Sequence, residues 1–310
     1  MPARYANLTR PAIVAAMLFG LVGCAFAQPA GRGDAVAADK PALGAAAVAL
    51  LTKGDAYYAE QQILQVAELK LSDRCMRQQG LRDPAVDAPA QIDRDEDWHP
   101  DLQQRRIRGY QLGKTDDKPT SESSADVYLR TLSARERERF HQALAGGPSD
   151  QTPLTLSSGQ TFTFPTAGCI AESRGRLYGS PTTAARIEFI PQGHYVGLYF
   201  KAIEDTRYHR AIEVWGGCMH GRGYPFATQA QARSQAAAAH KSSSATAAAK
   251  QEIAIAVADA QCAGTAGLTR TVQGLLRGYA KGLPAAQAKE LEELAALRTE
   301  AVRRAEDLVN

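Results

Sequence analysis

The chain has 310 residues, a formal net charge of +3, 45% hydrophobic residues and 7% aromatic residues. This near-neutral balance argues against nucleic acid as a partner, because surfaces that bind nucleic acid carry clustered Lys and Arg. The length is sufficient for one sizeable core or two modest cores. Scarce aromatic residues and abundant alanine predict helices that pack closely through small side chains.

Residues 1–23 have the three regions of an export signal. Arg4 and Arg10 give a positive start, and 11–22 form an apolar core. That core of about a dozen residues is too short for a membrane-spanning helix, which needs about 20 residues. Removal of the two arginines with the signal leaves a mature charge of +1.

Two cleavage sites follow this core and lead to different locations. Leu21-Val22-Gly23-Cys24 resembles a lipobox, after which the cysteine is acylated, whereas Ala25-Phe26-Ala27 before Gln28 is an A-x-A signal-peptidase site. Small residues at positions 22 and 23, and a cysteine directly at the end of the apolar core, favour the lipobox. We therefore expect 1–23 to be a lipoprotein signal peptide and Cys24 to carry a lipid that attaches the protein to the outside of the cell membrane. The A-x-A cut would release it as a secreted protein instead.

Four further cysteines stand at positions 75, 169, 218 and 262. An even number in an exported chain predicts two disulfides, for which three pairings are possible. The absence of a C-x-x-C pair argues against a thioredoxin-like redox site. Only Cys218 and His220 are closely spaced, so zinc is not expected, and neither is another metal or cofactor.

The pattern after the signal predicts a flexible tether over 24–54 followed by helices. Within 55–79, Leu64, Ala67, Leu71 and Cys75 recur at spacings of three and four, and Gly80 ends the run. Residues 83–124 predict a long polar loop with one short helix over 102–110. A capping box of Ser133 and Glu136 then starts a helix that ends at Gly146.

The second half of the chain predicts one β-hairpin and more helices. Alternating residues on both sides of 157–160 indicate the hairpin. Helices are expected over 169–178, over 196–219 with an interruption at 205–206, over 251–262 and over 284–310, while the Ala/Ser segment 236–250 is a weak helix former. The last helix is expected to pack on its own domain rather than in a coiled coil. The expected fold class is mainly α, with helices pinned by two disulfides and one small β-hairpin.

A weak repeat suggests how the cysteines pair. "CMRQQGL" from Cys75 and "CMHGRGY" from Cys218 share Cys-Met-x-x-x-Gly followed by an apolar residue, each at the end of an expected helix. One further cysteine follows each copy, at positions 169 and 262. We therefore expect the disulfides Cys75–Cys169 and Cys218–Cys262, within a first helical unit over 55–185 and a second over 186–310.

Four stretches of the chain resemble a family of uncharacterised secreted lipoproteins common in actinobacteria. They are "DVYLRTLSARERERFHQALAGG", "GCIAESRGRLYG", "WGGCMHGRGY" and "EIAIAVADAQC", and the last contains an Ala-Asp-x-x-Cys motif. The resemblance implies an exported, mostly helical protein with disulfides. It supplies no catalytic residues.

Few residues of the sequence suggest a catalytic or metal-binding role. The sequence lacks the serine-hydrolase elbow G-x-S-x-G, the zinc motif H-E-x-x-H, a P-loop and a dinucleotide fingerprint. Acidic residues before His99 could hold a divalent cation, although a solvated loop is expected. His209 and His220 flank Trp215 and could form a polar pocket, although helix-surface histidines are expected. Two pairs, Glu172 with Arg174 and Asp259 with Arg270, are interpreted as structural.

The favoured hypothesis is a lipid-anchored cell-envelope protein with a structural or partner-binding role. It has no catalytic motif, and its partner is the membrane together with an unidentified envelope or extracellular protein. The alternative is an extracellular hydrolase whose site is assembled from scattered loops. A solute-binding lipoprotein of the α/β type is disfavoured, because the alternation of strands and helices in its lobes is missing.

Overall fold

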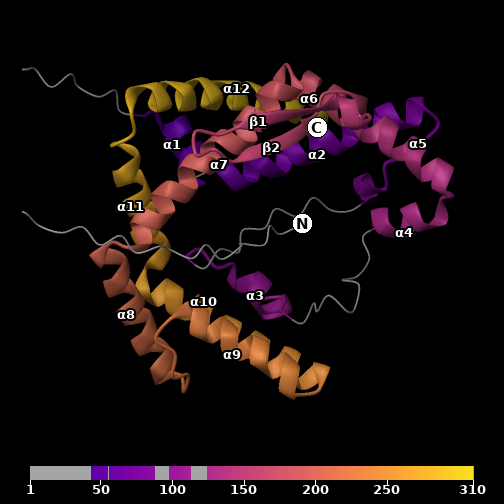
Figure 1. Cartoon of the computed structure of the whole chain (residues 1–310). Helices are drawn as coiled ribbons and strands as arrows, with labels where there is room; N and C mark the ends of the chain where they lie inside the picture. Colours follow the sequence, from indigo (N-terminus) through magenta and orange to yellow (C-terminus); the bar gives the residue numbers. More distant parts are fainter. Residues whose placement is uncertain (1–42, 55, 88–97, 113–123, 310) are drawn as a thin grey trace, which may run out of the picture. The chain divides into compact units, whose positions relative to one another are not determined.

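Twelve α-helices and one antiparallel β-hairpin form the regular structure of the computed structural model, which describes residues 43–54, 56–87, 98–112 and 124–309 (Figure 1). This confirms the expected mainly α fold. The helices up to the hairpin are α1 (Ala45–Thr52), α2 (Tyr57–Gln78), α3 (Leu102–Arg108), α4 (Ser124–Thr131) and α5 (Ala134–Ala145), with short 3-10 turns at Pro84–Asp87 and Pro148–Asp150. Strands β1 (Gln151–Thr155) and β2 (Thr161–Pro165) pair with Gln151 opposite Pro165 and Thr155 opposite Thr161. The later helices are α6 (Gly168–Tyr178), α7 (Pro181–Ile203), α8 (Thr206–Gly221), α9 (Gln229–Ser242), α10 (Ala245–Ala266), α11 (Leu268–Ala280) and α12 (Ala285–Val309).

The largest apolar core lies among α1, α2, α6, α7, α11 and α12. Helix α12 packs against α1, α2 and α6, and α11 packs against α7. Each fully buried leucine there stabilises the fold by about 1.5–3 kcal/mol relative to an exposed one. Its buried leucines are Leu50, Leu51, Leu64, Leu71, Leu177, Leu198, Leu275, Leu276, Leu291 and Leu294.

The expected boundary between two helical units, 55–185 and 186–310, falls inside α7, and the described residues from Leu43 onward cluster as one compact unit. The first and last helices belong to one unit because the apolar face of α12 packs against α1 and α2 at the start of the described chain. None of the helices in the described part of the chain combines the length and apolarity needed to cross a membrane.

The prediction of a flexible tether over 24–54 is wrong for its C-terminal part. Residues 45–52 form α1, which buries Ala47, Leu50 and Leu51 in the main core. Thr52 is the one polar residue of this helix, so no periodic pattern is visible, but alanine and leucine favour helix, and Ala47, Leu50, Leu51 and Thr52 are buried. The signal peptide over 1–23, Cys24 and the tether up to residue 42 lie outside the described residues.

Other helices differ from expectation at their starts. Helix α7 begins at Pro181 rather than at residue 196, with Ser180 as its N-cap and the proline in its first turn. Helix α10 begins at Ala245 rather than at residue 251, because Ser244 accepts a hydrogen bond from the amide of Ala247 and caps it. Helix α11 was not expected from the sequence.

The final helix α12 packs on its own domain as expected. Leu297 is 40% exposed rather than part of the buried face. Glu300 pairs with Arg303 at 3.0 Å, whereas Arg304 donates a hydrogen bond to the carbonyl of Leu177 at 2.6 Å.

Both copies of the Cys-Met-x-x-x-Gly repeat end a helix in the same way. The glycines Gly80 and Gly223 have φ of +67° and +84°, a region that favours glycine. The residue after each glycine donates its amide to the carbonyl of the repeat methionine, Leu81 to Met76 at 2.9 Å and Tyr224 to Met219 at 3.0 Å. The glycine amide bonds the carbonyl three residues back in both copies. This pattern is the Schellman motif, so the repeat encodes a shared helix end.

The two disulfides pair as expected, Cys75 with Cys169 and Cys218 with Cys262. The first joins the end of α2 to the start of α6, and the second joins α8 to α10. Each lies in a smaller apolar cluster rather than in the main core, and each repeat methionine is fully buried beside it. The disulfides therefore reinforce the parts of the described chain with the least apolar packing.

The serine-rich break between α9 and α10 is expected to be the first part of the described chain cut by trypsin. Ser243 and Ser244 have extended backbone, and Lys241 is exposed beside them. Local opening there disrupts few large side chains, whereas opening α12 exposes main-core leucines. Mass spectrometry over a time course should detect the peptide end at Lys241 before ends at Lys289 or Arg303, and Lys241→Gln should delay it. Earlier cleavage inside α12 would contradict the expectation that α12 opens less readily than the break between α9 and α10.

Candidate functional site

A pocket of about 350 Å³ opens beside α2, and we call it the α2 pocket. Its walls come from α1, α2, α6, α7 and α12, and each of these helices also contributes residues to the main core. The lining residues are Leu50, Tyr57, Gln61, Leu64, Gln65, Glu68, Arg174, Tyr178, Ala184, Ile187, Glu188 and Arg298. Its volume lies at the lower end of the range for small-molecule sites, about 300–1,000 Å³.

Charged side chains of both signs meet in this pocket. Arg174 lies between two carboxylates, with Nη2 3.3 Å from Glu188 Oε2 and Nε 3.8 Å from Glu68 Oε2. Arg298 is paired with Glu60, stacks over the Tyr57 ring and donates to the Tyr57 carbonyl at 3.1 Å. Two glutamates and two arginines line the pocket, so their formal charges cancel.

The environment shifts the protonation of two lining residues. Loss of hydration raises the pKa of Glu188, with Arg174 opposing the shift and Glu68 adding to it. Burial raises the pKa of Tyr178 above its ordinary value, and the Glu68 carboxylate, which accepts the Tyr178 hydroxyl, raises it further. Tyr178 therefore remains a hydrogen-bond donor at neutral pH. The Glu188 side chain is 51% exposed and marks the side of the pocket that faces solvent.

Two buried polar atoms of the α2 pocket have no hydrogen-bond partner among the described residues. They are Oε1 of Gln65, an acceptor, and Nε of Arg174, a donor. Buried polar groups are nearly always paired, since leaving one unpaired costs about 1–3 kcal/mol. Two residues that line the pocket therefore each carry one unsatisfied polar atom, an acceptor on Gln65 and a donor on Arg174.

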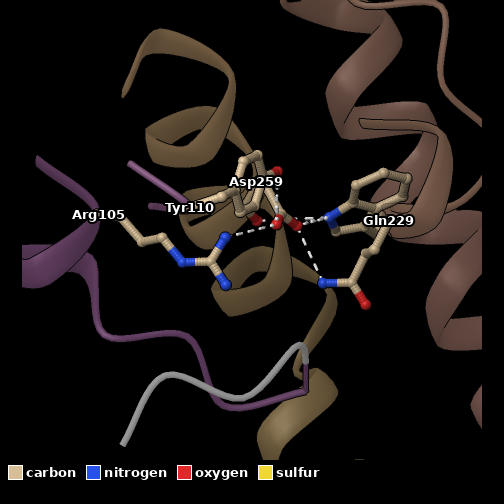
Figure 2. A network of polar contacts seen from close by, with 5 residues as sticks. Arg105, Tyr110, Gln229 and Asp259 are labelled. Atoms are coloured by element: carbon tan, nitrogen blue, oxygen red, sulfur yellow. Dashed lines mark hydrogen bonds and ion pairs between the residues drawn. The ribbon is translucent and has the colours of Figure 1, made fainter. Parts of the chain in front are cut away.

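A second polar constellation surrounds Asp259 on α10 (Figure 2). Its carboxylate accepts from Tyr110 Oη at 2.9 Å, from Trp215 Nε1 at 2.9 Å and from Gln229 Nε2 at 2.9 Å. Arg105 Nη1 lies 3.3 Å from the same carboxylate, and both charged side chains are fully buried. Burial raises the pKa of Asp259, while the donors from Gln229, Arg105, Tyr110 and Trp215 oppose the shift.

The Asp259 network holds helices together rather than facing a solute. Its members come from α8, α9, α10 and the segment around α3. Helix α10 packs against α3, α8 and α9. Next to it, Glu252 accepts the amide of Leu112 at 3.0 Å and lies 2.6 Å from His240 Nε2. A fully buried ion pair of this kind fixes which surfaces meet, so we assign the network to folding.

Neither of the two structural pairs expected from the sequence forms, because each acidic residue pairs with a different arginine. Asp259 pairs with Arg105 instead of Arg270. Glu172 pairs with Arg176 at 2.9 Å, one helical turn away, which leaves Arg174 to face Glu68 and Glu188 in the α2 pocket. Both partners were missed because sequence proximity does not show which side of a helix faces which neighbour.

The histidines considered in the sequence do not form a site in the described chain. His209 and His220 are exposed, whereas Trp215 is fully buried and faces Asp259, so no polar pocket joins the three. The His99 ring stacks on Tyr58, and the acidic run before Trp98 lies outside the described residues. No group of three or more His, Cys, Asp or Glu side chains that could hold a metal occurs among the residues that the structure describes.

The α2 pocket was not predicted, although the sequence of α2 contains a pattern that is compatible with one. Gln61, Gln65 and Glu68 follow one another at spacings of four and three, which places a polar stripe on one face of α2. That stripe runs beside the leucines of the same helix. Such a stripe also suits a solvated surface, so only the positions of α6, α7 and α12 reveal a pocket.

Comparison with protein families, with curated proteins and with solved structures finds no match to this chain. The two disulfides are the observation that bears on location, because such bonds persist in oxidising compartments outside the cytoplasm. They indicate an extracytoplasmic protein.

Proposed function

We propose that this chain is an exported, lipid-anchored protein of the cell envelope whose role is to bind rather than to catalyse. The single observation that carries the location is the pairing of a lipobox-like Leu21-Val22-Gly23-Cys24 with two disulfides in the same chain. An acylated cysteine after an export signal and an oxidised fold belong to the same compartment. The resemblance to secreted actinobacterial lipoproteins supports the same location.

The α2 pocket supports a binding role. It is preformed by packed helices, and its lining contains no histidine, serine or cysteine. Hydrolases can use a pair of carboxylates as acid and nucleophile, but both glutamates of this pocket face the Arg174 guanidinium instead of standing free. An extracellular hydrolase is the alternative, and nothing in the pocket favours it over binding.

Replacing Cys24 tests the anchor. We expect the unaltered protein to partition into the detergent phase and Cys24→Ser to appear in the aqueous phase, because the serine cannot carry the lipid and the cut after Ala27 can still release the chain. The matched control is Ala27→Gln, which blocks the A-x-A site but leaves the lipobox intact and should change nothing. Release of the unaltered protein, or loss of anchoring in Ala27→Gln but not in Cys24→Ser, would contradict the proposal.

A further inference from the structure

We infer that the α2 pocket binds a small zwitterion that carries an ammonium group and a carboxylate, as a free amino acid or a dipeptide does. The inference rests on the proposed binding role and names the ligand class. It starts from the two unpaired atoms, Gln65 Oε1 and Arg174 Nε, which line one pocket and have opposite hydrogen-bonding character. A single ligand with a donor at one end and an acceptor at the other satisfies both.

The acceptor side of the pocket suits an ammonium group. Gln65 Oε1 lacks a donor among the described residues, and the half-exposed Glu188 carboxylate pairs with Arg174 at 3.3 Å. Ammonium is a compact group with N–H donors that hydrogen bonds to carbonyl and carboxylate oxygens. Tyr178, whose hydroxyl donates to Glu68, keeps that second carboxylate in place.

The donor side suits a carboxylate. Arg174 uses Nη2 toward Glu188, while Nε has only the 3.8 Å approach to Glu68 and no hydrogen bond. Guanidinium N–H groups pair well with carboxylates, and such charge-assisted bonds are the strong ones. The Arg174 side chain lines the pocket and is 17% exposed, so it is largely shielded from water.

Charges of both signs line the pocket, which suits a ligand that also carries both. Arg174 lies between Glu68 and Glu188, and Arg298 is paired with Glu60. The volume of about 350 Å³ fits a molecule of amino-acid to dipeptide size.

Isothermal titration of the full chain in detergent with three matched probes tests the inference. L-norvaline carries both groups, pentanoate lacks the amine and butylamine lacks the carboxylate. We expect norvaline to bind with a Kd below about 1 mM and each single-ion probe to bind at least tenfold more weakly. Pentanoate or butylamine binding as tightly as norvaline, or no binding by any of the three, would overturn it.

Two variants locate the binding in the α2 pocket. Gln65→Leu removes the unpaired acceptor, and Arg174→Lys keeps the positive charge between the glutamates but removes the Nε donor. Each should weaken norvaline binding at least tenfold, about the effect of one lost charge-assisted hydrogen bond. The matched control is Gln62→Leu, an exposed residue on the same helix outside the pocket, which should bind as the unaltered chain does.

Equal affinities in Gln65→Leu and Gln62→Leu would place the ligand elsewhere and overturn the inference. The titration uses purified protein and does not depend on anchoring. A failure of zwitterion binding is therefore distinguishable from a failure of the Cys24 experiment.

Discussion

Replacing Asp259 with alanine is expected to lower the free energy of unfolding by about 3–5 kcal/mol. The change leaves the Arg105 guanidinium fully buried without the carboxylate that faces it at 3.3 Å. It also removes the acceptor used by Tyr110, Trp215 and Gln229. Because whole domains are stable by about 5–15 kcal/mol, this one side chain accounts for a large share of the total.

Denaturant titration followed by circular dichroism at pH 7 measures this loss. The matched control is Asp307→Ala, which removes an exposed carboxylate from α12 and should change the stability by less than about 0.5 kcal/mol. A loss of less than about 1 kcal/mol for Asp259→Ala would mean that the Asp259 network does not hold the helices together.

Removing either disulfide is expected to cost about 4 kcal/mol, because the cross-links close loops of 94 and 44 residues and restrict the unfolded chain. Cys75→Ala with Cys169→Ala should loosen the cluster around α5, and Cys218→Ala with Cys262→Ala should loosen the cluster of α8, α9 and α10. Loss of both cross-links should leave the chain marginally stable or unfolded.

Denaturant titration of each double variant, with and without reductant, checks this expectation. The unaltered chain without reductant serves as the reference, and reductant should destabilise each double variant further by opening its remaining disulfide. If either double variant lost less than about 1 kcal/mol, its disulfide would be incidental to the stability of the fold.

Features encoded by neighbouring residues could be predicted from the sequence. The capping box of Ser133 and Glu136 is present as expected, because both partners lie within one turn. The repeat ends at Gly80 and Gly223 were also predictable, since a helix end that needs a positive φ selects glycine. The cysteine pairing followed from the position of each repeat along the chain.

Features that depend on packing between distant segments could not be predicted. Arg105 and Asp259 are 154 residues apart, and no local pattern identifies them as partners. The α2 pocket requires Arg174 and Glu188 from separate helices to meet a polar stripe on α2. Helix α1 was read as tether because its short apolar run becomes recognisable as helix only when its burial in the core is known.

Intact mass spectrometry of the mature protein, purified from the membranes of its host, tests the central proposal most directly. We predict a chain that begins at Cys24, carries the added mass of acyl lipid and retains both disulfides. A mature chain that begins at Gln28 and carries no lipid would contradict the proposal.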